Sequence, residues 1–304
     1  MLSANGTMLC DGRAFNNKKM KMSTQVDLFT NVEPTSVSPA IAKPFVSRST
    51  FYQGDCLVEM DKIADKSVDM ILCDLPYKKT DCKWDTIIPF EPLWDQYERI
   101  IKNNGVVVLT ANEPFTSLLV VSKIKWYRHR WIWEKDKSAN IFLTKSQPLK
   151  KTEDVIVFSK VGFQKSWNDN TEKSLYNPQM TMTDKPRIET GRKKGKSMAQ
   201  INNRPKEMQY KTDPNKDPNS RFPKEIIYFP VPYKDRVHPT QKPVELMEYL
   251  IKTYTNEGDT VLDNCMGSGT TGVACKKTGR HFIGIEKDEN YYNVAVRRVS
   301  EYCG

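Results

Sequence analysis

The sequence predicts an α/β fold in which a doubly wound, mostly parallel sheet carries helices on both faces. Short apolar runs alternate with amphipathic segments over residues 50–160, and the same alternation returns after residue 243. Alternation of this kind is typical of parallel sheets built from strand–helix–strand units. A polar and basic stretch at residues 161–235 interrupts the pattern, and this predicts an inserted region.

The first half of the sheet is predicted from apolar runs and the turns between them. We expect a short strand and turn at 51–56, strands at 68–74, 106–109, 131–133 and 155–158, and helices at 57–63, 93–101 and 118–124. A turn is expected at Asn103-Asn104-Gly105. The strands at 131–133 and 155–158 are expected to form an antiparallel pair at one sheet edge.

The second half follows the inserted region. An amphipathic helix is predicted at 243–254, with Pro243 in its first turn. Strands are then expected at 259–263 and 281–286, separated by a tight loop at 267–271 that opens a helix ending near 277. A last helix is predicted at 290–300.

These elements predict four regions in the chain. Residues 1–48 lack sustained periodicity and are expected to be a poorly ordered tail, with Met22 as an alternative start, so deleting residues 1–21 should leave activity intact. The regions that follow are a first half-domain at 49–160, a basic insertion at 161–235 and a second half-domain at 236–304.

Composition narrows the classes of protein. The chain has 304 residues and a mean hydropathy of −0.62, and no run of 18 apolar residues or secretory leader is visible, so neither a membrane protein nor a secreted one is expected. Its seven cysteines are scattered without C-x-x-C spacing, which indicates free thiols in a reducing cytoplasm rather than disulfides or a metal site. The net charge of +10 favours a polyanionic partner. Residues 161–235 carry 15 Lys or Arg against nine Asp or Glu, so we expect the insertion to contact nucleic acid.

The tetrapeptide Asp74-Leu75-Pro76-Tyr77 ends the predicted strand at 68–74. Ligands bind at the carboxyl ends of strands in open α/β sheets. A carboxylate and a backbone carbonyl stiffened by Pro76 can accept hydrogen bonds from a flat exocyclic amine, and the ring of Tyr77 can stack on a base. A strand that leads into a proline turn, with Asp74 as a turn residue, is the alternative reading.

A second constellation lies at 263–286. The order strand, Gly267-Ser268-Gly269 loop, helix, strand and acid is that of a nucleoside-binding unit, in which Glu286 can bind two ribose hydroxyls. The full G-x-G-x-x-G spacing is absent, and Asp263 stands where a pyrophosphate would be repelled. This pattern favours a cationic ligand such as S-adenosylmethionine over a dinucleotide.

Together these motifs resemble the DNA amino-methyltransferases. The segment 261–271 is similar to their cofactor motif, 237–243 to the segment on the other side of the cofactor, and 74–77 to their catalytic motif. Their order, with the basic region between catalytic and cofactor motifs, resembles the beta class. The resemblance covers about residues 50–302 and is strongest for phage- and prophage-type adenine-N6 enzymes; it implies a seven-stranded-type methyltransferase sheet with an inserted target-recognition region.

The resemblance implies a role for each matching position. Asp74 with the carbonyl of Leu75 or Pro76 would hold the target amine, and Tyr77 would stack on the flipped base. Asp263, Gly267, Ser268, Gly269 and Thr270 would line the methionine end of S-adenosyl-L-methionine, Glu286 would bind its ribose and Asp55 its adenine edge, flanked by Thr240 and Lys242. A turn aspartate remains the alternative for Asp55, and a surface lysine for Lys242.

Three positions depart from the family pattern: Leu75, Lys78 and the pair Asn264-Cys265. An aspartate at the first catalytic position favours adenine-N6 over cytosine-N4 as the target. An RNA methyltransferase and a catalytically silent DNA-binding module remain alternatives, although a silent module has no reason to keep Asp74, Tyr77, Asp263 and Glu286 together. DNA is the expected partner; the sequence does not reveal the recognition site, a partner restriction nuclease, a preference for single or double strands, or whether a homodimer forms.

Overall fold

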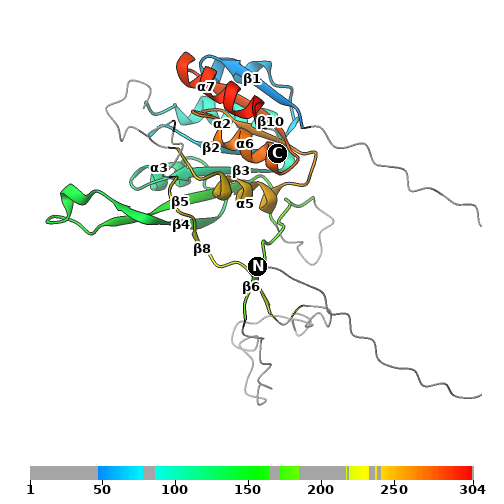
Figure 1. Ribbon diagram of the computed structural model, residues 1–304. Helices are drawn as coiled ribbons and strands as arrows, with labels where there is room; N and C mark the ends of the chain where they lie inside the picture. The colour runs from blue at the N-terminus through cyan, green and yellow to red at the C-terminus, as the bar shows by residue number, and fades with distance from the viewer. Residues whose placement is uncertain are drawn as a thin grey trace, which may run out of the picture. The chain divides into compact units, whose positions relative to one another are not determined.

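The computed structural model describes residues 47–77, 86–163, 172–184, 217, 219–232, 237 and 241–302. Within these residues, eight strands form one sheet in the order β1-β10-β9-β2-β3-β5-β4-β8 (Figure 1). The strands are β1 (Ser49–Gln53), β2 (Val68–Asp74), β3 (Ile101–Ala111), β4 (Tyr127–Ala139), β5 (Lys150–Ser159), β8 (Ile226–Tyr228), β9 (Thr260–Asp263) and β10 (His281–Glu286).

Strand directions confirm the predicted fold class. The neighbours β1, β10, β9, β2 and β3 run parallel. Strand β5 lies antiparallel between β3 and β4, which confirms the antiparallel pair expected around 131–133 and 155–158. The eighth strand, β8, pairs parallel with the outer edge of β4 and extends the sheet beyond the seven strands expected.

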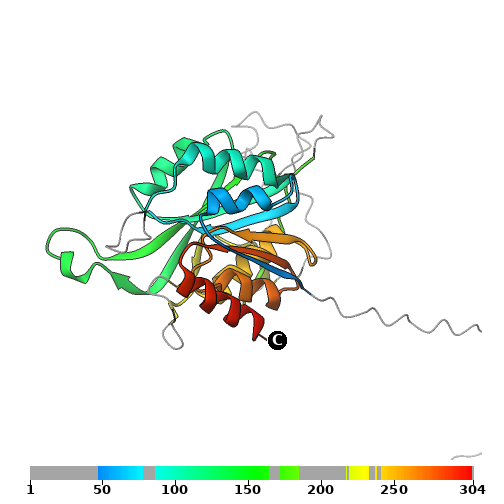
Figure 2. The ribbon, with the colours of Figure 1, turned by 90° about the horizontal axis from the view of Figure 1, so that it is seen from above.

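Helices cover both faces of the sheet (Figure 2). One layer holds α1 (Cys56–Glu59), the 3₁₀ turn η1 (Met60–Lys62), α2 (Phe90–Ile100) and α3 (Phe115–Ser122). The opposite layer holds α5 (Val244–Tyr254), α6 (Thr270–Lys277) and α7 (Glu289–Ser300). The described segments contain no helix that is long and apolar enough to cross a membrane.

Strand β2 shows why the central strands read as continuous apolar runs. Ile71 and Cys73 pack into the core beneath α1, α2 and α3, whereas Met70 and Leu72 pack into the core on the other side. Because successive side chains point to opposite faces, a strand segment with helices on both sides is apolar on both, as the run from Met70 to Cys73 is. The polar residue Asp74 then follows where the strand leaves the core.

The expected turn at Asn103-Asn104-Gly105 is wrong as a separate element. These residues lie within β3, at an irregularity where Val68 pairs with Ile101 and Met70 pairs with Val106. The turn residues are therefore accommodated as a bulge, opposite Asp69, while the strand continues. Pro243 directly precedes α5 as its N-cap instead of lying in the first turn.

The described part of the predicted insertion is only partly separate from the main sheet. Strands β6 (Thr181–Met182) and β7 (Ser220–Arg221) form their own antiparallel pair, whereas β8 belongs to the main sheet. Among the aromatic residues of the insertion, Tyr176, Phe222 and Tyr228 are exposed, and Trp167 and Tyr210 lie outside the described residues. The boundary at residue 235 and the nucleic-acid role of the insertion stay predictions. Residues 1–46 of the expected tail also lie outside the described residues.

Candidate active site

The predicted site residues meet where the sheet changes its winding direction. From β2 the chain continues to β3 on one side, and from β9 to β10 on the other, so the crevice at the β2–β9 junction is a topological switch point. Asp74 ends β2, Asp263 ends β9 and Glu286 ends β10. Because these strands are parallel neighbours, their three acids reach the same edge of the sheet.

The glycine-rich loop follows β9 and opens α6, as predicted. Gly267 and Gly269 have φ angles of 49° and 76°, and a Cβ on Gly269 would lie 3.0 Å from the Cβ of Ala295 on α7. Glycine is therefore required at 269 by both conformation and packing. Arg298 of α7, which sequence reasoning missed, donates to the hydroxyls of Ser268 and Thr270 at 3.2 and 3.1 Å and fixes this loop.

Asp263 lies at the base of the loop and is 4% exposed. Its Oδ2 accepts from the Thr271 hydroxyl at 2.6 Å, and its Oδ1 accepts from the Cys265 amide at 3.2 Å. Burial raises the pKa of Asp263 to about 7, against hydrogen bonds that favour the charged form. A buried carboxyl that titrates near neutrality favours a cationic ligand.

Glu286 and Asp55 lie at the far end of the loop. Glu286 accepts from the amides of Gly267 and Asp288, at 2.8 and 2.9 Å, and burial raises its pKa. Each carboxylate oxygen retains a further lone pair with which it can accept a hydrogen bond from a hydroxyl. Asp55 caps α1 through the Leu57 amide at 3.1 Å and pairs with Lys287 at 3.0 Å. The turn-aspartate reading of Asp55 is thus realised as a helix cap, and its cofactor role stays a prediction.

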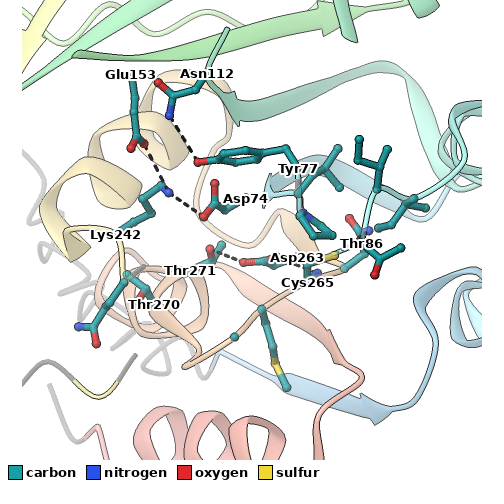
Figure 3. Close-up of a pocket in the computed structure, with 18 of the residues that line it drawn as sticks. Asp74, Tyr77, Thr86, Asn112, Glu153, Lys242, Asp263, Cys265, Thr270 and Thr271 are labelled. Carbon is teal, nitrogen blue, oxygen red and sulfur yellow. Dashed lines mark hydrogen bonds and ion pairs between the residues drawn. The ribbon is translucent and has the colours of Figure 1, made fainter. Parts of the chain in front are cut away.

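Asp74 is held by residues from two other parts of the chain, and Figure 3 shows its contact with Lys242. Its Oδ2 lies 2.6 Å from the Nζ of Lys242, and its Oδ1 accepts a hydrogen bond from the Thr110 hydroxyl. Thr110 pairs with Asp74 across β3 and β2, so the two side chains leave the sheet edge together. The carboxylate is thereby fixed in orientation while it still has lone pairs available to an amine.

Lys242 is buried, with a side chain 7% exposed, and the alternative of a surface lysine is wrong. Its Nζ pairs with Asp74 and lies 3.4 Å from Oε2 of Glu153, whose Oε1 contacts Lys135. Burial alone would lower the pKa of Lys242, but the carboxylates of Asp74 and Glu153 raise it above its usual range. For Glu153, the two lysines outweigh burial and lower the pKa. Two carboxylates and two ammonium groups therefore form one neutral cluster.

Tyr77 packs its ring on Phe115 of α3, with ring centroids 5.5 Å apart and an interplanar angle of 27°. Its hydroxyl accepts from Nδ2 of Asn112 at 3.4 Å, and burial raises its pKa to about 12. The phenol therefore stays neutral at physiological pH, and the ring is held by packing. Leu75 is buried beside it, and Pro76 borders the same space.

One cavity of about 880 Å³ joins the two constellations. It is lined by every predicted site residue that the structure describes except Gly269, namely Asp55, Asp74, Leu75, Pro76, Tyr77, Lys242, Asp263, Gly267, Ser268, Thr270 and Glu286. Thr240 lies outside the described residues. Thr110, Asn112, Lys135, Glu153 and Arg298 were missed; only Thr110 and Asn112 carried a signal, because they follow the carboxyl end of a strand next to β2.

Comparison with known proteins places this geometry in context. The DNA methylase family of N6 and N4 methyltransferases matches residues 68–297. The type II methyltransferase M1.MboII of Moraxella bovis is 28% identical over 266 residues, which cover 80% of this chain and 94% of that protein. The DNA adenine methyltransferase YhdJ of Escherichia coli K12 is 29% identical over 266 residues, which cover 82% of each.

Solved structures show the same fold. The complex of M1.HpyAVI with S-adenosylmethionine has a TM-score of 0.51 at 23% identity, covering 82% of this chain and 99% of that one. The cytosine-N4-specific PvuII DNA methyltransferase has a TM-score of 0.58 at 14% identity, covering 85% of this chain and 88% of that one. At these identities the likeness concerns the fold alone, and it does not select between adenine and cytosine.

Proposed function

The chain belongs to the DNA methylase family of N6 and N4 methyltransferases, and we propose which of its residues transfer a methyl group from S-adenosyl-L-methionine to the N6 amine of adenine in DNA. One observation carries the assignment. Asp74 and Tyr77 line the same cavity as the glycine-rich loop and its acids, so an amine acceptor and a cofactor site face one space. The activity is that of an S-adenosyl-L-methionine-dependent DNA adenine-N6 methyltransferase.

The end of the cavity at the glycine-rich loop fits the cofactor in its chemistry. Asp263, Glu286 and Asp55 are all acids, which suits a ligand with a cationic ammonium and vicinal hydroxyls and disfavours a pyrophosphate. We assign Glu286 to the ribose, Asp263 and the loop of Gly267, Ser268 and Thr270 to the methionine end, and Asp55 to the adenine edge. The bound cofactor supplies a methyl group activated by a sulfonium.

The opposite end of the cavity, at Asp74 and Tyr77, fits a flipped base. The lone pair of an adenine N6 amine is delocalised into the ring, so the amine is a weak nucleophile. Hydrogen bonds to Asp74 and to the carbonyl of Leu75 or Pro76 favour a tetrahedral nitrogen, whose lone pair then points toward the methyl donor. Tyr77, already stacked on Phe115, aligns the base. Asp74 is also the hydrogen-bonded acceptor for the proton that leaves the methylated nitrogen.

Lys242 is placed here as a positioning residue for Asp74. Its ammonium holds one oxygen of Asp74, and Glu153 holds the ammonium in turn. From the sequence, Lys242 was expected to flank the cofactor. Because its ammonium contacts Asp74, we assign Lys242 first to the amine acceptor. A site whose charges are fixed before the substrate binds does not have to reorganise during the reaction.

Single-molecule, modification-aware sequencing of DNA from cells that express the chain tests this function, with an Asp74→Ala strain beside it. We expect N6-methyladenine at one recurrent short motif, absent from the Asp74→Ala strain, while the purified variant still binds S-adenosyl-L-methionine. An Asp65→Ala strain is a matched control, because Asp65 is an exposed carboxylate paired with Arg99. Methylcytosine at the motif would move the target to cytosine-N4, and methylation by Asp74→Ala would refute the catalytic assignment.

Two further assignments rest on this function. We propose that the protein acts in the cytoplasm of a bacterial or phage-infected cell, and we assign the basic range 161–235 to target recognition because of its surplus of six positive charges. Light scattering tests whether the protein assembles as a homodimer. Whether it acts with a partner nuclease is tested by asking if the motif is also cut in the host.

A further inference from the structure

The hairpin of β4 and β5 ends in a loop whose apolar side chains face solvent. Figure 1 shows this hairpin extending away from the body of the sheet. At its end, the 3₁₀ turn η2 (Ile141–Leu143) and Leu149 form what we call the apolar tip, defined as Ile141, Phe142, Leu143 and Leu149. Phe142 is 101% exposed and Ile141 66%, and Leu143 and Leu149 are about half exposed. Exposed apolar clusters of this kind mark interaction sites.

The loop that carries the apolar tip is closed by its own hydrogen bonds. Asn140, in a left-handed conformation with φ 58°, accepts from the Lys150 amide at 2.8 Å and donates to the Pro148 carbonyl at 3.2 Å. The Leu143 carbonyl accepts from the amides of Ser146 and Gln147 at 2.9 and 3.0 Å. The backbone that carries the apolar side chains is thus fixed, which lowers the ordering cost when the loop enters a partner.

The loop that carries the apolar tip reaches the rim of the catalytic cavity through Leu143. Asn140, Leu143, Gln147 and Lys150 line the same cavity as Asp74 and Tyr77. Strand β5 also carries Glu153, which contacts the lysine that holds Asp74. A duplex that presents a base to this cavity is therefore adjacent to the loop.

The charge of the hairpin end fits a nucleic acid. Residues 137–151 contain four lysines, Lys137, Lys145, Lys150 and Lys151, and no acid. Cations beside an exposed phenylalanine match a duplex, in which phosphates flank a stack of bases. A second copy of the chain fits less well, because four apolar side chains fall far short of the roughly 800 Å² per partner of a stable interface and two lysine-rich loops repel one another.

We propose that the apolar tip is a wedge that enters the DNA duplex at the target adenine, with Phe142 occupying the space in the stack that the flipped base leaves. The wedge rests on the proposed function and extends it by naming the group that holds the duplex open. Unpairing and unstacking a base is unfavourable, and an inserted apolar side chain restores part of the lost stacking.

Two duplexes test the wedge, both carrying the motif found by sequencing. One is fully paired, and the other has an abasic site opposite the target adenine, which is then unpaired before the protein arrives. We expect Phe142→Ala to lower kcat/KM on the paired duplex by roughly tenfold or more and on the abasic duplex by less than about threefold. Phe142→Leu keeps apolar bulk and should retain most of the activity on the paired duplex.

Controls separate the outcomes. Val121→Ala removes an exposed apolar side chain, 74% exposed on α3, and should leave both rates unchanged. Equal losses on the two duplexes, or no loss on either, would overturn the wedge, as would a change of molar mass on light scattering of Phe142→Ala. Wild-type protein that methylates neither duplex would refute the proposed function and the wedge together; wild-type turnover with an unaffected Phe142→Ala refutes the wedge alone.

Discussion

The two ends of the catalytic cavity are built in different ways. Nearly all of the cofactor end comes from one continuous stretch, Asp263 to Glu286, in which a strand, a loop, a helix and a strand follow one another. The amine end joins Asp74 of β2, Thr110 of β3, Glu153 of β5 and Lys242, which is 168 positions from Asp74. A local motif therefore positions the cofactor, and long-range pairing positions the amine acceptor, so variants should separate binding from turnover.

Lys242→Met gives the largest effect expected beyond Asp74 itself, because it removes the cation from between two carboxylates. Glu153 then keeps Lys135, and Asp74 keeps only the hydroxyl of Thr110, and breaking a buried ion pair lowers the free energy of unfolding by about 3–5 kcal/mol. We expect kcat to fall steeply, whereas the affinity for S-adenosyl-L-methionine, measured by calorimetry, should change little. Chemical denaturation measures the loss of stability.

Glu153→Gln is the matched variant that keeps the shape and the Lys242–Asp74 contact. It should lower kcat less than Lys242→Met and leave cofactor affinity intact. If either variant weakens cofactor binding as much as it weakens turnover, Lys242 belongs to the cofactor end, in line with its position beside the family's cofactor segment. The division between the two ends would then be wrong.

The same division explains what could be read from the sequence. Gly267, Asp263 and Glu286 were predicted because spacing within one strand–loop–helix–strand unit already implies their proximity. Asp74 was predicted because it ends an apolar run. Glu153 was not, since the antiparallel register of β5 on β3, where Thr110 pairs with Val155, brings it to Lys242, and no local pattern encodes register.

Lys242 and β8 are two further features that the sequence alone defined only in part. The sequence marked Lys242 as a site residue but not its partners, because a lysine side chain can reach in many directions until packing selects one. Strand β8 is a short apolar run inside a polar and basic range, and three residues are too few to indicate a strand before its pairing with β4 is known. The parallel core was predictable because burial on both faces leaves a continuous apolar pattern.

A smaller effect is expected from pH at the cofactor end. Burial raises the pKa of Asp263 to about 7 from the usual 3.8, so between these values the folded protein holds a proton that the unfolded chain has lost. The contribution of Asp263 to stability therefore falls as pH rises from about 4 to about 7. A cationic cofactor favours the ionised carboxylate, so its affinity should rise by up to about tenfold per pH unit below pH 7.

Calorimetric titrations between pH 5.5 and pH 7.5 would check this, with Asp263→Asn as the matched variant, because an asparagine still accepts from Thr271. The variant should bind more weakly and with a flat pH profile. A flat profile in the wild-type protein would mean that Asp263 shapes the loop without meeting the cofactor's charge, and the cofactor end would then depend on its backbone more than on its acids.

The smallest effect separates the two roles of Asp55. As the N-cap of α1 it accepts from the Leu57 amide, and loss of a cap lowers the free energy of unfolding by about 1 kcal/mol. Asp55→Ser keeps a capping oxygen and removes the carboxylate, whereas Asp55→Ala removes both. If Asp55 also binds the adenine edge, both variants should weaken cofactor binding while only Asp55→Ala loses stability. A serine variant with unchanged affinity would make Asp55 a structural cap and would leave the cofactor end contained within the stretch from Asp263 to Glu286.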